Sequence, residues 1–521
     1  MRIPYIVGAV ALSTSFAIIA GSGPSSGAVP PENVPAPLAR CSPVQIVSHA
    51  VTNPGPVLTS TITAALARIC SGGTISVTPG TYDERLAIGK DVTIRGIGIA
   101  PAVIANVGAE LPGQPALVTV TGAVDVRLEG LSLAPRFIDG VLGVTAAAGA
   151  ATVAIVDAEV TGGRIGIYGT FHRLTVTGTA LSGAALHCVS AFSDQRPGST
   201  AAFGTSSATG CGSSGFRATN FGVASFSDLF AGPTPEGIVS LDNARISIRD
   251  SVTMNTRHGF WIRGASSGAV RNNSSSSSRV TSFLVQDTAN VRFEGNDALS
   301  SLDRGIAISG ARGLDLVDNF VFHPGGAGLS VHDSDDIDTV TNVIRRATPG
   351  VYVQGSRDVV MVGDAITQGT RAGVELREVS GFQAYLLDID TIAGVPVVDP
   401  TGGDADLGDF GHGVIVEHTG ASGAFFAGCR LRNLRLAGIA GFNTFRPGQP
   451  QLATRVVTSG VQVACAAYAF DTESEPGTPD TTVEGTAFCR DCDGVPFECT
   501  AVSLDLEPPD ALPQLQSSDA P

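Results

Sequence analysis

Positive charge is scarce in this sequence of 521 residues. Lys90 is the only lysine, and 32 basic residues face 48 acidic ones, so the formal net charge is −16. An acidic surface repels nucleic acid and anionic membranes, and we therefore exclude both as partners. The same charge opposes the binding of acidic polysaccharides, unless local arginines or a bridging cation assist it.

Aromatic and charged residues are also sparse, at 6% and 15% of the chain. Hydrophobic residues make up 43%, and the mean hydropathy of +0.23 is too high for a disordered protein. The 64 glycines suit a fold with many turns. Val, Ile, Ala and Thr are abundant, which favours stacked strands over helices.

Long hydrophobic runs are missing beyond the N-terminus. The one such run, residues 3–20, follows Arg2 and has the character of a secretory signal. An uncleaved membrane anchor is the alternative, but a short hydroxyl-rich segment dilutes the run. We predict a signal peptide over residues 1–28, a linker over residues 29–56, and no membrane insertion after cleavage. The mature protein is then secreted or held at the cell surface.

Nine cysteines in an exported chain predict disulfides, although their pairing does not follow from the sequence. Cys429 lies among the repeats and is the candidate for an unpaired thiol. Cys489 and Cys492 also have the spacing of zinc ligands, but only one further cysteine lies near them. The remaining cysteines flank the start of the repeats, an insertion and the C-terminal end: Cys41, Cys70, Cys188, Cys211, Cys465 and Cys499.

A glycine followed by alternating apolar residues recurs along the chain. Its positions are Gly259, Gly305, Gly328, Gly350, Gly373 and Gly413. Most steps are 22 or 23 residues, whereas the first spans two periods and the last includes an insertion. The first and third residues after each glycine point to the same side of a strand, so they predict aliphatic stacks inside a solenoid.

A second column, of asparagine and aspartate, accompanies the glycines. It consists of Asp250, Asn273, Asn296, Asn319, Asn342, Asp364 and Asp388. Such a column is typical of a bend where a buried amide bonds to the backbone and to its neighbour in the next turn. Each period of about 23 residues is therefore one coil, and successive coils pair in parallel about 4.8 Å apart.

The two ends of the repeat array differ from its middle. Residues 59–70 have apolar positions at helical spacing, which predicts a short helix that covers the open N-terminal end. The expected regions are the solenoid with this N-terminal cap over residues 57–453, a cysteine-rich C-terminal cap over residues 454–505, and a disordered tail over residues 506–521.

The segments TISVTPGTYDERLAI and VTIRGIG, followed by the two columns, resemble the pectin-lyase-like superfamily over residues 57–445. The resemblance implies an all-β fold, the single-stranded right-handed parallel β-helix. That fold carries lyases, hydrolases, epimerases, esterases, phage tailspikes and surface proteins, so the function has to be argued from a site.

The second and fourth residues after each glycine should point outward and line one exposed sheet. An aromatic, amide and charged strip some 30 Å long suits an extended polysaccharide. The plain alternative is that outward positions on any soluble sheet are polar. The candidate substrate-binding residues on this strip are Trp261, Arg263, His332, Tyr352 and Gln354.

Titratable residues beside the insertion are the candidates for catalysis: Glu375, Arg377, His412 and Glu417. The triplet around His412 resembles the histidine motif of polygalacturonase-type glycoside hydrolases. Those enzymes also need carboxylates that protonate the leaving oxygen and activate water. Their adjacent aspartate pair is missing, because residues 371–373 read Arg-Ala-Gly at that place.

The insertion over residues 390–412 carries alternating aspartates, Asp404, Asp406 and Asp409, in a glycine-rich loop. Such oxygens can bind calcium, the one cofactor that the sequence suggests, and a solvated acidic loop is the alternative. The resemblance implies that calcium would neutralise a uronate carboxylate while a basic side chain takes the C5 proton.

The sequence therefore predicts a secreted β-helix protein that binds an extracellular, acidic polysaccharide along an exposed sheet. Whether it also processes the polysaccharide is left open. The alternatives are a non-catalytic surface or adhesion protein and a calcium-assisted polysaccharide lyase or C5-epimerase. No nucleophilic triad, phosphate-binding loop or dinucleotide motif stands out.

Overall fold

A computed structural model describes most of the chain. The described residues are 41–50, 55, 57–106, 115–147, 149–393, 411–420, 422–443, 452–474, 478–479, 481–492, 494–497 and 501–503. The chain divides into two units, Met1–Cys41 and Ser42–Pro521, and all elements below belong to the second. Within this described part, no helix has the length and apolar character needed to cross a membrane.

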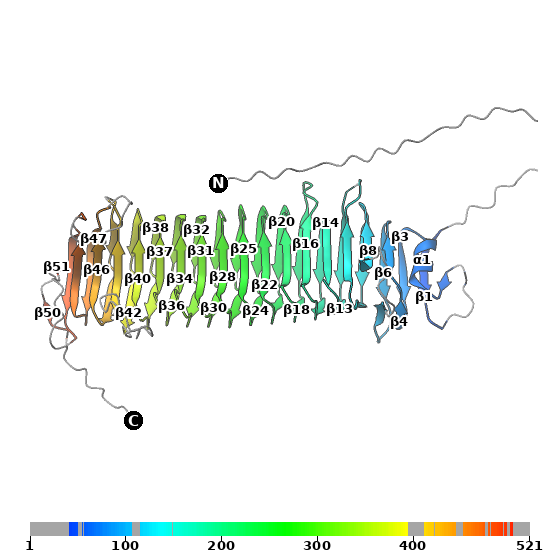
Figure 1. The fold of residues 1–521 in the computed structure, drawn as a ribbon, viewed down its shortest axis with the longest axis horizontal. Coiled ribbons are helices and arrows are strands. Elements are labelled where there is room, and N and C mark those ends of the chain that lie inside the picture. Colours follow the sequence, from blue (N-terminus) through cyan, green and yellow to red (C-terminus); the bar gives the residue numbers. More distant parts are fainter. Residues whose placement is uncertain are drawn as a thin grey trace, which may run out of the picture. The chain divides into compact units, whose positions relative to one another are not determined.

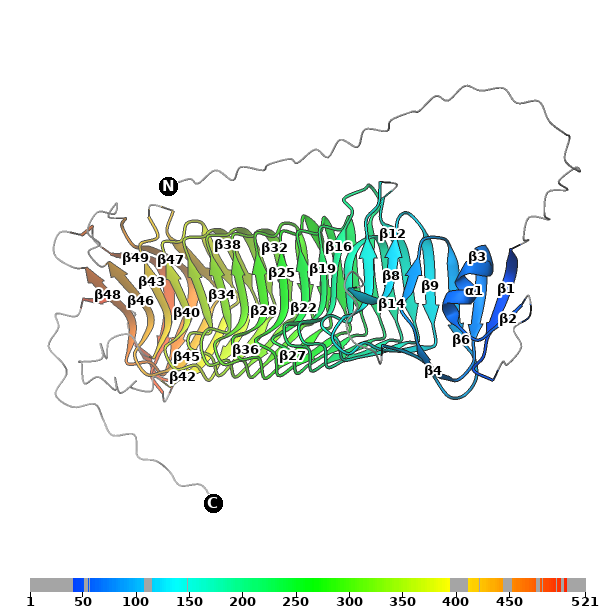
Figure 2. The ribbon, with the colours of Figure 1, turned by 45° about the vertical axis from the view of Figure 1, so that its right-hand side comes forward.

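The second unit is a parallel β-solenoid of about 18 turns (Figure 1). A typical coil contains three strands, and each strand pairs in parallel with the strand three positions later. The solenoid therefore has three sheets, which we name face 1, face 2 and face 3. Figure 2 shows the face 1 strands β22, β28, β34 and β40 stacked along the solenoid.

Face 1 consists of β5 (Leu86–Ile88), β8 (Ala116–Thr121), β11 (Asp139–Val144), β14 (Ile167–Thr177), β16 (His187–Ser193), β19 (Ser214–Thr219), β22 (Glu236–Leu241), β25 (His258–Arg263), β28 (Thr281–Gln286), β31 (Arg304–Ser309), β34 (Leu329–His332), β37 (Val351–Gln354), β40 (Ala372–Arg377), β43 (His412–Glu417), β46 (Ala437–Asn443), β48 (Tyr468–Ser474) and β51 (Ala501–Ser503). Face 2 consists of β1 (Ser42–Val47), β3 (Ile69–Val77), β6 (Val92–Gly96), β9 (Asp125–Glu129), β12 (Ala151–Val156), the second part of β14, β17 (Thr200–Gly204), β20 (Val223–Ser227), β23 (Arg245–Arg249), β26 (Ser267–Arg271), β29 (Val291–Glu294), β32 (Arg312–Val317), β35 (Asp335–Val340), β38 (Arg357–Val362), β41 (Phe382–Tyr385), β44 (Ala424–Ala427), β47 (Arg455–Ala464) and β49 (Thr482–Arg490). Face 3 consists of β4 (Gly80–Asp83), β7 (Ala102–Ala105), β10 (Leu131–Ala134), β13 (Glu159–Thr161), β15 (Ala180–Ser182), β18 (Ser207–Thr209), β21 (Phe230–Ala231), β24 (Val252–Met254), β27 (Ser274–Ser276), β30 (Asp297–Leu299), β33 (Phe320–Phe322), β36 (Val343–Arg345), β39 (Ala365–Thr367), β42 (Asp388–Ile392), β45 (Arg430–Leu434) and the last part of β47. Two short strands complete the set, β2 (Leu58–Thr59) beside β1 and β50 (Pro496–Phe497) antiparallel to β49.

The predicted N-terminal helix is present as α1 (Ile62–Arg68). The Thr61 side chain accepts a hydrogen bond from the Ala64 amide at 3.2 Å, and the Glu84 carboxylate accepts from the Ile62 and Thr63 amides at 2.7 Å each. These bonds satisfy amides that have no partner within the helix. The predicted linker is wrong in one part, because β1 lies within it and pairs in parallel with β3.

The core lies inside the coils, as the glycine column predicts. Phe260 and Ile262, the first and third residues after Gly259, are fully buried, and the Phe260 ring stacks on Phe283 of the next coil at 4.7 Å. The glycine itself sits at an inner corner. A Cβ at Gly259 would overlap Ser275 Oγ of face 3, so any larger residue would displace the strands beside it.

The asparagine column forms a buried ladder at the bend between faces 2 and 3. Asn273, Asn296, Asn319 and Asn342 each donate from Nδ2 to Oδ1 of the next member at 2.9–3.0 Å. Each backbone amide donates to the same oxygen. The last acceptor is the Asp364 carboxylate, which burial holds at a raised pKa. A carboxylate has no N–H to pass on, so the ladder ends there.

Asp250 and Asp388 do not belong to the ladder. The ladder position before Asn273 is Ser251, whose amide donates to Asn273 Oδ1 at 3.1 Å, while the Asp250 side chain is 37% exposed and pairs with Arg249. Asp388 pairs in register with Ala365, one residue beyond the ladder, and its side chain contacts Arg432 at 3.1 Å. Both predictions were one residue out of register.

The coils also continue past the predicted solenoid boundary at residue 453. β47, β48 and β49 each pair in parallel with a strand of the preceding coil, so these three strands extend the solenoid. Disulfides join Cys188 to Cys211 and Cys465 to Cys492, and Cys489 is also disulfide-bonded. The zinc interpretation of this pair is therefore wrong. Among the described cysteines, Cys429 is buried and free, as predicted.

Candidate functional site

The outer surface of face 1 carries all five predicted substrate-binding residues. Trp261 and Arg263 lie on β25, His332 on β34, and Tyr352 and Gln354 on β37, and all five are half-buried. In the strand register His332 is paired with Gln354. From β25 to β37 there are four coil steps, which separate Trp261 from Tyr352 by about 19 Å.

The aromatic side chains of this strip are held by neighbouring amides. Trp261 Nε1 donates to Gln286 Oε1 at 3.0 Å, and the Tyr352 hydroxyl donates to Gln354 Oε1 at 2.9 Å. The His332 ring lies 5.3 Å from the Tyr352 ring. Burial raises the pKa of Tyr352 and lowers the pKa of His332, so both rings are uncharged at neutral pH.

Three of the four predicted catalytic residues meet at the C-terminal end of the strip. Arg377 Nε lies 2.8 Å from Glu375 Oε1 and 3.5 Å from Glu417 Oε2. The strand register explains this contact, because Arg377 on β40 is paired with Glu417 on β43. Arg371 Nε lies 3.0 Å from Glu375 Oε2, and His418 Nε2 lies 3.4 Å from Glu417 Oε1.

His412 lies at the opposite end of β43 from Glu417. It begins β43 and is in register with Ala372, and its ring meets Phe442 edge-on at 5.9 Å. It is buried, on the same strand as Glu417. Face 1 therefore holds all four predicted catalytic residues, and Glu375, Arg377 and Glu417 form the ion pairs given above.

Arg377 stays charged in this network. Burial lowers the pKa of Arg377, but Glu375 and then Glu417 outweigh it, so that its pKa is raised and the guanidinium stays charged. Such a group cannot take a proton from a sugar. Glycoside hydrolysis needs one protonated carboxyl beside one carboxylate. Here both carboxylates contact the same arginine.

Face 1 also carries a second group of polar residues that the sequence did not predict. Ser214, Glu236 and His258 occupy the same register position on β19, β22 and β25. His187 on β16 continues this column, and its Nδ1 lies 2.7 Å from Ser214 Oγ. Arg217 lies farther along β19. Ser214, Glu236 and His258 directly precede repeat glycines, which is the only signal that the sequence carries for them.

Glu236 is the one acidic residue named in this second group, and its pKa is strongly raised. Burial raises its pKa to about 7, although Arg257 lowers it in part. The pKa values of His187 and His258 are lowered by burial and by Arg217 and Arg257 respectively. Perturbed pKa values in such a cluster are typical of functional sites.

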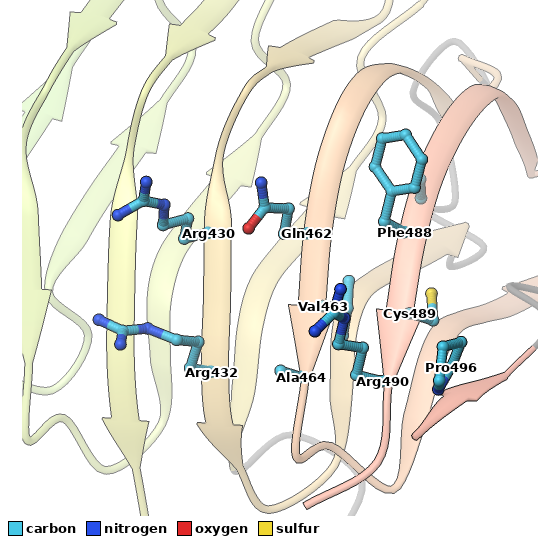
Figure 3. Close-up of a pocket in the computed structure, with 10 residues that line it drawn as sticks. Arg430, Arg432, Gln462, Val463, Ala464, Phe488, Cys489, Arg490 and Pro496 are labelled. Carbon is cyan, nitrogen blue, oxygen red and sulfur yellow. The ribbon is translucent and has the colours of Figure 1, made fainter. Parts of the chain in front are cut away.

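A hollow of about 630 Å³ lies at the C-terminal end of the solenoid and is lined by residues of β45, β47, β49 and β50 (Figure 3). Arg430 and Arg432 of β45 reach it beside Gln462 of β47 and Arg490 of β49. Arg432 is neutralised by aspartates of β42, at 3.1 and 3.4 Å. The described residues that line the hollow include no carboxylate and no imidazole. We therefore place the candidate site on face 1.

The predicted calcium ligands Asp404, Asp406 and Asp409 lie outside the described residues. In the described ranges, no three His, Cys, Asp or Glu side chains are placed to hold a metal ion. Calcium binding stays a prediction.

Residues 236–386 match the family model described as a right handed beta helix region. With the parallel coil stacking above, this match confirms the right-handed parallel β-helix. No curated protein matches the sequence.

Several solved structures are similar to the chain. The bacteriophage CBA120 tailspike protein 3 is 14% identical over 64% of this chain and 55% of its own, with a TM-score of 0.43. The periplasmic alginate epimerase AlgG is 11% identical over 78% of this chain and 84% of its own (TM-score 0.34). The A-module of the Azotobacter vinelandii mannuronan C-5 epimerase AlgE4 is 16% identical over 61% and 86% (TM-score 0.32). This chain spans about half the length of the tailspike. Identities this low concern the fold alone.

Proposed function

We propose that this right-handed parallel β-helix protein binds an extracellular polysaccharide along the outer surface of face 1. The observation that carries the proposal is the register, which lines up Trp261, His332, Tyr352 and Arg377 on one surface. From β25 to β43 there are six coil steps, or about 29 Å, a length that suits an extended chain of several sugars.

The side chains of this strip have the chemistry that a polysaccharide requires. The rings of Trp261 and Tyr352 are half-buried and fixed by hydrogen bonds, so they can stack on sugar rings with little loss of conformational freedom. Gln354 and His332 offer polar atoms to hydroxyl groups. Arg377 keeps its charge, but Glu375 and Glu417 already neutralise it, so this end of the strip adds no net positive charge for an acidic sugar.

Binding without cleavage is the form of the proposal that the geometry supports best. The carboxylates Glu375 and Glu417 both contact Arg377, whose guanidinium stays charged and therefore cannot accept a proton from a sugar. A calcium-assisted lyase or epimerase would depend on the loop that carries Asp404, and this alternative stays a prediction. Export is supported by the disulfides Cys188–Cys211 and Cys465–Cys492, which persist in oxidising compartments.

The test compares two tyrosines that differ only in their face. On face 1, Tyr352 donates a hydrogen bond to Gln354, two residues after it. On face 2, Tyr385 donates a hydrogen bond to Gln383, two residues before it. We expect Tyr352→Ala to weaken the binding of a polysaccharide by about 1–2 kcal/mol, or five- to thirtyfold, and Tyr385→Ala to leave it unchanged. The measurement is titration calorimetry with a panel of neutral, uronic and sulfated polysaccharides.

Two outcomes would contradict the proposal. One is the absence of binding to every polysaccharide of the panel, and the other is an equal loss in the two tyrosine variants. Ultraviolet absorbance at the same time, with calcium and with chelator, reports unsaturated uronate. A calcium-dependent rise in this absorbance would show that the protein is a lyase and would overturn the proposal of binding without cleavage.

A further inference from the structure

Three successive coils of face 1 carry buried polar atoms that have no hydrogen-bond partner among the described residues. They are Arg217 Nε on β19, Glu236 Oε2 on β22 and His258 Nδ1 on β25. A buried polar group without a partner costs about 1–3 kcal/mol, and most such groups in proteins are paired. Three of them lie on adjacent strands of one surface, where a partner from outside the chain would supply the missing hydrogen bonds.

Among the described residues, Arg217 also has no counter-ion. It is half-buried, and no carboxylate in the described ranges forms an ion pair with it. Burial lowers its pKa, and the neighbouring Arg263 lowers it further. One face of its guanidinium lies over the Phe192 ring, with Cζ 6.0 Å from the ring centre. An unneutralised cation in a protein of net charge −16 is the feature expected of an anion-binding residue.

Aromatic rings flank this cation along the solenoid. Tyr168 lies two coils before Arg217 in the same register column, and Trp261 lies two coils after it, each about 10 Å away. The residues between them, Ser190 and Val239, are short and buried. A ligand that lies along the solenoid can therefore contact both rings and the guanidinium.

These groups define the chemistry of the ligand. The guanidinium needs an acceptor with negative charge, the carboxyl oxygen of Glu236 needs a hydroxyl donor, and the imidazole of His258 accepts or donates a bond to a second hydroxyl. Glu236 repels an incoming anion less than an ordinary glutamate does, because its pKa of about 7 leaves it partly protonated at neutral pH. Rings on both sides suit the apolar face of a sugar.

We propose that Arg217, Glu236 and His258 form a subsite for a sugar unit that bears a carboxylate or sulfate group. Arg217 binds the anionic group, and the other two side chains turn outward to bind hydroxyls of the same or the adjacent sugar. This inference rests on the proposed function and extends it, since it names the ligand class and places a subsite on coils before Trp261.

The test uses pairs of polysaccharides that share a backbone and differ in charge. Polygalacturonate is compared with its methyl ester, and dextran sulfate with dextran, by calorimetry on the full chain. The bidentate arginine contact predicts that wild type prefers one charged member roughly tenfold or more. The two pairs distinguish a carboxylate from a sulfate source.

Variants assign that preference to the subsite. Arg217→Gln should reduce the preference to about one while leaving the affinity for the neutral member unchanged, and Arg217→Lys should retain part of it. The matched control is Arg292→Gln on face 2, an arginine that Glu294 already neutralises at 3.1 Å. Circular dichroism and thermal unfolding verify that each variant is folded.

The outcomes separate the two proposals. If neutral and charged polysaccharides bind equally, or if Arg217→Gln keeps the preference, the subsite is overturned and the proposed function stands. If no polysaccharide binds, the proposed function fails, and the ¹⁵Nε resonance of Arg217 is titrated with galacturonate and with sulfate. A saturable shift supports the subsite. A shift no larger than that of Arg292, the mark of an adventitious ion only, overturns it.

Discussion

The asparagine ladder offers a prediction whose magnitude follows from the contacts of one side chain. Asn319 Nδ2 donates to the Phe293 carbonyl at 3.2 Å and to Asn342 Oδ1 at 2.9 Å. Its Oδ1 accepts from the backbone amide and the side chain of Asn296, at 3.1 and 2.9 Å. Asn319 is buried, so water cannot replace these bonds.

Asn319→Ala removes all four bonds, and the Asn296 amide then loses its acceptor in the ladder. That amide stays buried, while Asn296 Nδ2 keeps Val270 O, Asn342 Oδ1 keeps the Asn319 amide, and the Phe293 carbonyl remains in the parallel ladder of β29 with β32. At about 2 kcal/mol for the one orphaned group, the free energy of unfolding should fall by at least about 2 kcal/mol.

Urea unfolding measures this loss, with Trp261, the single tryptophan of the chain, as a fluorescent probe and circular dichroism as a second one. The control is Asn272→Gly, since Asn272 is an exposed neighbour with a φ of 54° that glycine adopts freely. We expect it to change stability by less than about 1 kcal/mol. A loss for Asn319→Ala of the same small size, with an unchanged urea slope, would refute the reasoning.

Two further predictions concern pH and a covalent link. The folded-state pKa of Glu236, about 7, lies above its ordinary value of 4.5, so the folded state binds more protons between these values and the free energy of unfolding falls as pH rises through them. Allowing for its partial exposure, the fall is about 1–2 kcal/mol, and Glu236→Gln should remove it in urea unfolding at pH 5 and pH 8. Replacing Cys188 and Cys211 by serine opens a link that spans 23 residues, which should lower stability by about 3 kcal/mol. Equal urea midpoints for this variant and the oxidised wild type would contradict that estimate.

The repeat columns were predictable because the same contact recurs in every coil. Gly259 and its equivalents sit at an inner corner that admits no side chain, and Asn296 has identical partners one coil on either side. Asp250 and Asp388 were placed wrongly at the two ends of the ladder. There the column changes to Ser251 and ends at Asp364, so spacing alone no longer defined the register.

The candidate site was only partly predictable. Glu375, Arg377 and Glu417 were expected near one another because a solenoid brings equivalent positions of adjacent coils together, and the ion pairs follow from that register. Arg217 and Glu236 were not expected. Each occurs once, without a repeated pattern, and what distinguishes them is the absence of partners around a buried atom.

The sequence by itself determined the coil, its period and the inward and outward sides of face 1, because a parallel solenoid stacks like on like and its periodicity is written along the chain. The tertiary structure decided where the ladder stops, which cysteines pair, and which polar side chains have partners. These properties depend on the side chains that surround an atom in three dimensions, and those neighbours come from adjacent coils about 22 to 45 residues away, as in the contacts of Asn342 with Asp364 and of Asp388 with Arg432.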